Sequence, residues 1–553
     1  MTCRADAPTV GHHGAIFPRH LERSRRPTMR SPFAIAATAM AGFVLALPAT
    51  AQADDAKLGQ VHFETSCKPE AQKLFNRAMT YQHSFWYRAS QKTFEDALAA
   101  DPECAIAYWG IGQALLYNPF SPPPPKNLAD GLAAIQKGKA AGAKTQRERD
   151  FVDALGAFYT DYDKVDHRTR VQAYAKAMEQ LAQRYPKDDE AQIYYALALN
   201  IAASPADKTY ASQLKAAAIL EQIFKRQPQH PGVAHYLIHT YDYPPIAEKG
   251  LDAAKRYSKI APAAPHAQHM PSHIFTRVGF WKESIASNIA SAHSAKEGKD
   301  IDEQMHASDY MVYAYLQLGQ DTKARAVVDE MKTVTGYDRV AGYYALAASP
   351  ARYVVERGDW KAAADLQIRP SQFAYVDAIT HYARAMGAAR SGNPDGAKVD
   401  IAKLAELRDK LRQAKDAYWS EQVDVQWQVA SAWLLYAEGK HDDALKAMSA
   451  AADAEDKTEK HVVTPGVLKP ARELYGVMLL ERGMPNEALA AFETVLKKEP
   501  NRLGAYAGAA AAAEKSGDKT KAHGFYQKVV AIAGDADKTR TEVADARAFL
   551  KTH

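Results

Sequence analysis

Two pairs of histidines with identical spacing are the residues of this sequence that most directly suggest chemistry. His235 and His239 form one pair, and His269 and His273 form the other. Four residues are about one helical turn, so both imidazoles of a pair lie on one side of a helix. Imidazole nitrogen binds zinc, copper, nickel and iron, so each pair offers two metal ligands. The second pair follows the first by 34 residues, which predicts the same position on two neighbouring structural units.

The histidines lie on a stripe that differs from the packing face of the predicted helix. With His235 at 0°, His239 lies at about 40° and Asp242 at about −20°, since each residue turns a helix by about 100°. The apolar residues of the same segment centre at about −120°. The stripe is therefore distinct from the core face, and the following helices carry matching residues. The candidate metal ligands are His235, His239, Asp242, His266, His269, His273, His306 and Asp309, with His83 and Arg277 as further residues of this face.

The species that such a stripe binds stays open at this point. Imidazole with occasional carboxylate suits several transition metals, and no Cys or Met box favours Cu(I), so we expect zinc first and copper second. Contact with a metal-free peptide or small ligand would explain the same residues, and so would a hydrogen-bonded polar cluster. The sequence has no Cys-x-x-Cys-His motif, and residues 138–145 miss the P-loop spacing by one residue. We therefore expect neither haem nor nucleotide.

The elements that would position the stripe follow a helical repeat. Small, aromatic and proline residues recur at fixed spacing, and a glycine followed five residues later by an alanine marks several helix corners. The residues that carry the pattern are Ala78, Tyr81, Tyr87, Phe94, Ala97 and Pro102, then Gly319 and Ala324, Gly439 and Ala444, Gly483, Ala488, Phe492, Val495 and Pro500, and finally Gly517, Ala522, Tyr526 and Val529. With these residues the chain resembles the tetratricopeptide repeat superfamily, whose 34-residue helix pairs stack into a solenoid.

This resemblance implies an all-α, right-handed solenoid of about a dozen helix pairs. In that family the first helix of each pair lines a concave groove. The resemblance therefore implies that the stripe, with His83 and Arg277, faces an open groove, and that a protein or peptide ligand binds there. Other repeats of this chain hold Trp109 and Gln113, or Ile193 and Leu197, where His235 and His239 would fall. Repeat packing alone therefore does not require histidine at these positions.

The N-terminus carries the features of a secretory signal. Arg30 precedes the apolar run 33–47, and Ala51-Gln52-Ala53 is a small-x-small cleavage site, with Met29 the expected true start. The first 53 residues hold six Arg, one Asp and one Glu, so the net charge of +5 falls to +1 without them. We expect a periplasmic or secreted protein with no membrane span after cleavage, and near-neutral charge gives no support for nucleic-acid binding. We expect repeats over 54–320, with the histidine groove, and over 321–553.

Two cysteines remain after the expected cleavage. Cys67 and Cys104 each precede the first helix of a predicted repeat, and they lie on the same edge of the stack. An even pair in an exported protein predicts a disulfide, with a buried unpaired cysteine at each place as the alternative.

These observations predict an exported binding or scaffold protein with a metal site in its groove. An alternative is a metal-dependent hydrolase or oxidase, with Asp242, Asp309 and Arg277 as candidates for the acid, base or charge stabiliser. The other alternative is a metal-free peptide-binding scaffold. Whether the chain is an enzyme is left open, although the lack of the His-Glu-x-x-His and Gly-x-Ser-x-Gly motifs favours binding.

Overall fold

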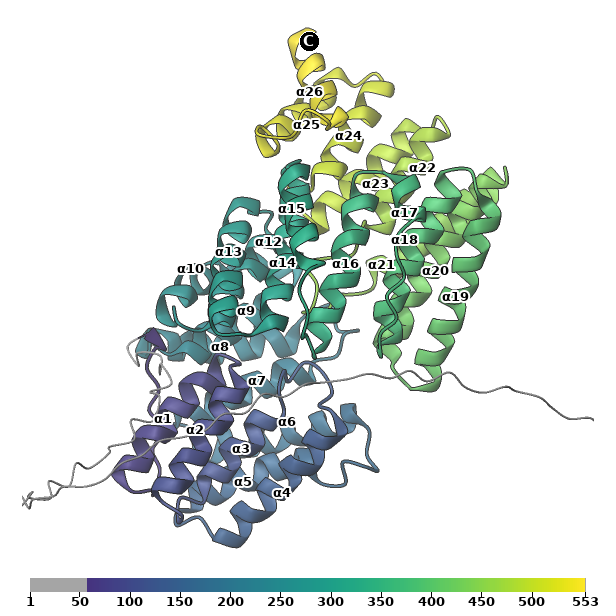
Figure 1. Ribbon diagram of the computed structural model, residues 1–553. Helices are drawn as coiled ribbons and strands as arrows, with labels where there is room; N and C mark the ends of the chain where they lie inside the picture. Colours follow the sequence, from purple (N-terminus) through teal and green to yellow (C-terminus); the bar gives the residue numbers. More distant parts are fainter. Residues whose placement is uncertain (1–56, 553) are drawn as a thin grey trace, which may run out of the picture. The chain divides into compact units, whose positions relative to one another are not determined.

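The computed structural model describes residues 57–552, and within this range the regular structure is helical, with no strand (Figure 1). The expected signal peptide, 1–53, lies outside the described residues. The described residues fall within one compact unit. The boundary expected after residue 320 falls in the turn between the helices Ile301–Gln317 and Asp321–Met331, and a division there stays a prediction.

The helices follow one another as pairs, with one final helix. Taking the split helix α11–α12 as a single element, the order gives twelve pairs, which confirms the all-α solenoid of about a dozen pairs. In chain order they are α1 (Pro69–His83), α2 (Tyr87–Ala100), α3 (Ile106–Leu115), α4 (Pro125–Ala141), α5 (Gln146–Tyr159), α6 (His167–Arg184), α7 (Asp189–Ala202), α8 (Ala211–Arg226), α9 (Pro231–Tyr241), the 3₁₀ helix η2 (Pro244–Gly250), α10 (Leu251–Ile260), α11 (Pro265–His269), α12 (Pro271–Arg277), α13 (Trp281–Glu297), α14 (Ile301–Gln317), α15 (Asp321–Met331), α16 (Val340–Glu356), α17 (Trp360–Ala364), α18 (Ala374–Arg390), α19 (Pro394–Gln413), α20 (Ala417–Ala437), α21 (His441–Asp456), α22 (Ala471–Glu481), α23 (Pro485–Lys498), α24 (Leu503–Lys515), α25 (Lys519–Ile532) and α26 (Thr541–Thr552).

The repeat residues form the packing between helices. Ala78 of α1 and Phe94 and Ala97 of α2 are fully buried. Gly110 of α3 leaves room for the Phe94 ring, because a Cβ there would come within 2.4 Å of it. The corner glycines Gly319 and Gly439 have φ of 67° and 81°, a left-handed conformation that suits glycine. Small residues and corner glycines therefore set the close spacing of successive helices.

A proline splits the helix that carries the second histidine pair. Pro271 lacks an N–H and cannot continue the hydrogen-bond ladder, so α11 ends at His269 and α12 begins at Pro271. The His273 N–H bonds to the Met270 carbonyl at 3.1 Å, a tighter turn than in an α-helix. His269 and His273 nevertheless stay on one side of the split helix, with ring centroids 4.9 Å apart.

The connection between α21 and α22 lies against helices from much earlier in the chain. We call residues 457–470 the covering segment. Lys460 Nζ lies 2.9 Å from Asp242 Oδ2, at the end of α9. The Tyr310 hydroxyl of α14 donates to the Thr464 carbonyl at 3.1 Å, and Arg352 of α16 donates to the Val467 carbonyl at 2.8 Å. These bonds tie a C-terminal connection to the helices that carry the histidines.

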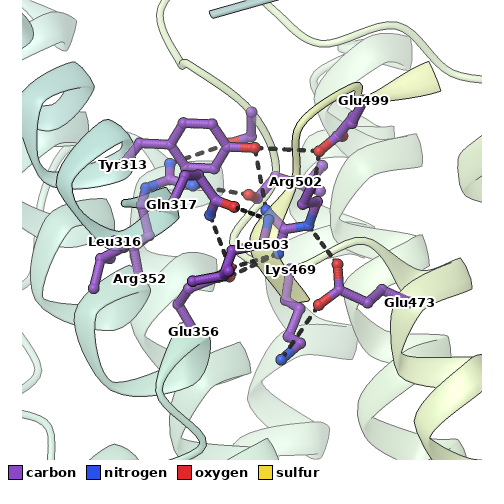
Figure 2. A network of polar contacts seen from close by, with 12 residues as sticks. Tyr313, Leu316, Gln317, Arg352, Glu356, Lys469, Glu473, Glu499, Arg502 and Leu503 are labelled. Atoms are coloured by element: carbon purple, nitrogen blue, oxygen red, sulfur yellow. Dashed lines mark hydrogen bonds and ion pairs between the residues drawn. The ribbon is translucent and has the colours of Figure 1, made fainter. Parts of the chain in front are cut away.

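A buried ion network joins α14 and α16 to α22 and α24 (Figure 2). The guanidinium of Arg502, whose side chain is fully buried, lies 2.7 Å from Glu356 and also pairs with Glu473. Tyr313 and Gln317 of α14 complete the network, since Arg502 donates to the Tyr313 hydroxyl at 3.2 Å and Gln317 donates to Glu356 at 2.8 Å. Each buried charge thus has an opposite charge beside it, which buried ions require.

Cys67 and Cys104 lie at bonding distance, with sulfur atoms 1.99 Å apart. The bond links the residues just before α1 to the turn between α2 and α3. In the described part of the chain no helix is both long and apolar enough to cross a membrane.

Candidate metal centre

The histidine stripe is buried, so the expectation of an open groove is wrong. His235 and His269 have no exposed surface, His273 is 1% exposed and His239 is 4% exposed. Of the eight expected ligands only His266 is not fully buried, and its side chain is 16% exposed. The stripe contacts the second helices of its own repeats, since the His235 ring stacks on Tyr257 of α10 and His269 bonds to Asn288 of α13. Other parts of the same chain cover it as well.

Two aromatic side chains and the covering segment bury the stripe. Phe85, in the corner between α1 and α2, has a φ of 53° and places its ring 4.3 Å from that of His235 and 5.6 Å from that of His239. Phe120, between α3 and α4, lies 4.6 Å from the His239 ring. The covering segment contacts the far end of the stripe through Asp242 and Tyr310. Sequence periodicity does not predict this burial, because these elements interrupt the repeat.

Three imidazoles from α9 and α11 form what we call the first histidine set: His235, His239 and His266. One nitrogen of each ring lies within 4.8 Å of the others. His235 donates Nδ1–H to the His83 carbonyl at 2.7 Å, so its Nε2 carries a lone pair. His266 places Nδ1 3.2 Å from the Glu303 carboxylate. A proton on this Nδ1 leaves a lone pair on the Nε2 of His266 as well. Neither Nε2, nor either nitrogen of His239, has a hydrogen-bond partner, although all are buried.

Three imidazoles from α11, α12 and α14 form the second histidine set: His269, His273 and His306. Their ligand atoms also lie within 4.8 Å of one another. His269 places Nδ1 2.7 Å from Asn288 Oδ1, and His273 places Nδ1 2.9 Å from Asp242 Oδ2. The Asn288 orientation is fixed because its amide nitrogen donates to the Ser284 carbonyl at 2.7 Å. The Nδ1 of His306 is buried without a partner.

The two fixed rings of the second set direct lone pairs at each other. His269 Nε2 and His273 Nε2 lie 3.0 Å apart. Asn288 Oδ1 and the Asp242 carboxylate only accept hydrogen bonds, so both Nδ1 atoms carry the protons and both Nε2 atoms are acceptors. Two facing acceptors repel unless a cation lies between them. A proton could serve, but it would create a buried imidazolium, whereas a metal ion bonds to both nitrogens at about 2.0–2.1 Å.

Burial favours the neutral form of five of the six imidazoles. It lowers the pKa of His273 to about 4, in spite of the Asp242 carboxylate beside it, and lowers the pKa of His306 to about 3. The pKa values of His235, His239 and His269 are also well below the ordinary value because of burial. Burial alone would raise the pKa of Glu303, yet the neighbouring His266 brings it to about 2. Neutral imidazole is the form that binds a metal ion.

The remaining expected residues surround the two sets rather than join them. Asp242 accepts from His273 and pairs with Arg277 at 2.8 Å and Lys460 at 2.9 Å, so it orients a histidine. Asp309 accepts from Ser349 at 2.8 Å and lies 3.5 Å from Arg352, outside both sets. Asp309 is therefore not retained as a ligand, because its carboxylate already faces a buried guanidinium.

His83, expected in the groove, belongs to a separate buried polar cluster. Its nitrogens lie 3.0 Å from the Tyr236 hydroxyl and 3.1 Å from Glu190. His230 contacts the same carboxylate at 2.9 Å and accepts the Val233 N–H with its other nitrogen. His83, Glu190 and His230 could geometrically surround an ion. Every imidazole nitrogen of this cluster already has a partner, so the cluster needs no ion.

Several residues of the centre escape sequence reasoning. Glu303 lies on the His306 side of α14, one turn earlier, and this spacing could have found it. Asn288 lies on α13, the second helix of its pair, whereas the histidine stripe predicts ligands on first helices only. Phe85, Phe120 and Lys460 lie in connections whose course no local pattern predicts.

Fold and site together define an all-helical repeat protein with a buried histidine centre. Comparison found no matching protein-family model and no matching curated protein. Among solved structures, the human IFIT1 dimer with m7Gppp-AAAA has a TM-score of 0.32 at 10% identity, covering 85% of this chain and 96% of that chain. Yeast Tom70 has a TM-score of 0.29 at 13% identity, covering 87% and 96%.

The TPR domain of P58(IPK) is also similar, with a TM-score of 0.19 at 12% identity, covering 87% of this chain and 99% of that chain. The last of these neighbours is by its name a domain of the repeat class that the sequence resembles. Since the TM-scores are below 0.5, the helix-pair organisation described above rests on this chain's own helices. The expected lack of nucleic-acid binding stays a prediction.

Proposed function

We propose that this protein is an exported helical-repeat scaffold that binds a transition metal through its buried histidines. The observation that carries the proposal is the 3.0 Å approach of His269 Nε2 and His273 Nε2, with both Nδ1–H groups committed elsewhere. The unpartnered nitrogens of His235, His239 and His266 support it, because buried polar atoms without partners are rare and costly. Metal binding supplies a partner for one nitrogen of each ring.

Zinc is the first expected ion and copper the second. The donor atoms are imidazole nitrogens, which suit both metals, and neither set of the described residues includes a thiolate. Carboxylates stand behind two of the imidazoles, an arrangement that fixes the tautomer and raises the basicity of a metal-binding histidine. The export part of the proposal is supported by the signal-like N-terminus and by the Cys67–Cys104 pair.

A metal-free role as a peptide groove at this stripe is disfavoured by its burial. Phe85, Phe120 and the covering segment occupy the space that a peptide would need. A metal-dependent hydrolase or oxidase stays a second candidate, because each histidine set offers three protein ligands, the number typical of catalytic zinc sites.

Elemental analysis of the protein purified without added metal or chelator tests the proposal. We expect zinc or copper to co-purify in at least stoichiometric amount, and the double variant His239→Ala/His273→Ala to lose it. His381→Ala is the matched control, since His381 is a buried histidine bound to Asp400 at 2.6 Å outside both sets. Apo protein that takes up neither Zn(II) nor Cu(II) on dialysis would overturn the proposal, as would full metal content in the double variant.

A further inference from the structure

We infer that the histidine centre holds two metal ions, one in each histidine set, and that each ion keeps an open coordination position. This inference rests on the proposed function and adds to it the number of ions and their coordination. Six imidazoles converge here, whereas a zinc ion in a protein takes four ligands in most sites. A single ion would therefore leave at least two buried lone pairs without a partner.

The two sets are built in the same way, although both take one histidine from α11. Each set has one imidazole backed by a carboxylate: His266 by Glu303 in the first set, and His273 by Asp242 in the second. This match means that each set can bind an ion without help from the other.

Each set also has one imidazole backed by a neutral oxygen. His235 donates to the backbone carbonyl of His83, and His269 donates to the side-chain amide of Asn288. The third members, His239 and His306, both have a buried Nδ1 without a partner. The parallel extends over all six rings, and four of the six belong to the two histidine pairs that recur 34 residues apart.

The carboxylates around the centre are also divided between the two sets. One buried carboxylate, Glu303, stands behind the first set, and one, Asp242, stands behind the second. No carboxylate oxygen belongs to either set of ligand atoms, so each ion would carry most of its charge. Water, hydroxide or another small anion would therefore fill the fourth position, as it does in sites with three protein ligands.

The sets are neighbours. The rings of His266 and His269 lie 5.9 Å apart, and so do those of His239 and His273. Phe85 and Phe120 pack on the first set, which limits the exogenous ligand to a small one. The centre therefore suits a pair of adjacent ions with small exogenous ligands rather than a large substrate.

Metal stoichiometry measured on set-specific variants tests the inference. Full-length mature protein is stripped with chelator and titrated with Zn(II), with bound zinc counted by elemental analysis after desalting. We expect two ions for the wild type and for the control His381→Ala. We expect one ion for His235→Ala, one for His269→Ala, and none for the double variant His235→Ala/His269→Ala. Where an Ala variant does not fold by circular dichroism, His239→Gln for the first set and His306→Gln for the second replace it.

The outcomes separate the inference from the proposed function. One ion in the wild type, lost in variants of either set, would show a single shared site and overturn the inference while leaving metal binding intact. No ion in the wild type would overturn both. The open position has its own readout: azide added to the Cu(II)-loaded protein should produce a new charge-transfer band, and an unchanged spectrum would contradict it.

Discussion

Lys460 Nζ lies 2.9 Å from Asp242 Oδ2, although 218 residues separate them in the sequence. The same carboxylate oxygen accepts from His273 Nδ1, and the other oxygen accepts from Arg277 at 2.8 Å. One buried carboxylate thus orients a proposed metal ligand and anchors the covering segment. The position of the covering segment and the orientation of His273 in the second histidine set are therefore coupled through Asp242.

Asp242→Asn tests this coupling. The change removes the carboxylate that pairs with both Arg277 and Lys460 and leaves these two buried cations beside a neutral amide. We expect a loss of roughly 3–5 kcal/mol in the free energy of unfolding, since uncompensated buried charge costs that much. Zinc affinity of the second set should fall about 10–100-fold, while the first set keeps its affinity. Urea unfolding and zinc competition measure the two effects.

Asp252→Asn is the matched control for that variant, because Asp252 is 73% exposed in its pair with Arg256. It should leave both quantities unchanged. Equal loss of affinity in both histidine sets would contradict a role for Asp242 confined to His273.

Sequence reasoning finds the helices and the histidines but not the enclosure. The helix pairs depend on contacts within and between neighbouring repeats, so the 34-residue recurrence and the corner glycines predict them. Phe85 and Phe120, which cover His239, lie in connections between helices. These connections follow no regular spacing, so the sequence does not predict where their side chains pack. The division into two sets is also invisible in the sequence, because His266 and His269 occupy one short helix yet belong to different sets.

Reduction of the Cys67–Cys104 bond should lower stability without releasing metal. The bond closes a loop of 37 residues, for which the chain-entropy relation gives roughly 4 kcal/mol. We expect Cys67→Ser/Cys104→Ser to unfold at lower temperature than the wild type, with metal content unchanged. Thermal unfolding with and without reductant measures the effect. A wild type whose melting temperature does not respond to reductant would show that the cysteines are not bonded in the isolated protein.

Acidification should loosen the covering segment through His461. Burial, followed by the charge of Lys460, lowers the pKa of His461 to about 4, below the unfolded value of about 6.5. Its Nδ1 accepts the Val463 N–H at 3.1 Å, and the ring packs 5.1 Å from Trp419. The folded state favours neutral His461, so its contribution is fully present above about pH 6.5 and declines as pH falls toward 4.

We therefore expect His461→Gln to lose less thermal stability than the wild type between pH 7.5 and pH 5. Melting temperatures of metal-free protein at the two pH values provide the measurement. Identical pH dependence in the two proteins would assign the acid sensitivity to other groups.

Arg502→Met should destabilise the fold while sparing the metal centre. Glu356 and Glu473 would lose the guanidinium between them and remain buried (Figure 2). We expect a loss of roughly 3–5 kcal/mol. Zinc stoichiometry of the folded protein should stay at the wild-type value, because the network contains no member of either histidine set. Loss of one ion in this variant would show that the network reaches the centre through α14.

His239→Leu should raise the stability of the metal-free protein and remove its response to zinc at the first set. The His239 ring packs between Phe85 and Phe120, and neither of its buried nitrogens has a partner. Leucine fills a similar volume and removes two polar atoms whose burial costs about 1–3 kcal/mol when they lack hydrogen bonds. The same substitution at His381 should instead destabilise the protein, because it removes one of the hydrogen-bond partners of the buried Asp400. Melting temperatures measured with chelator and with Zn(II) test both variants, since an ion that binds only the folded state raises the wild-type value. A His239→Leu protein that melts lower than the wild type in chelator, yet gains as much from zinc, would show that His239 is an ordinary packing residue.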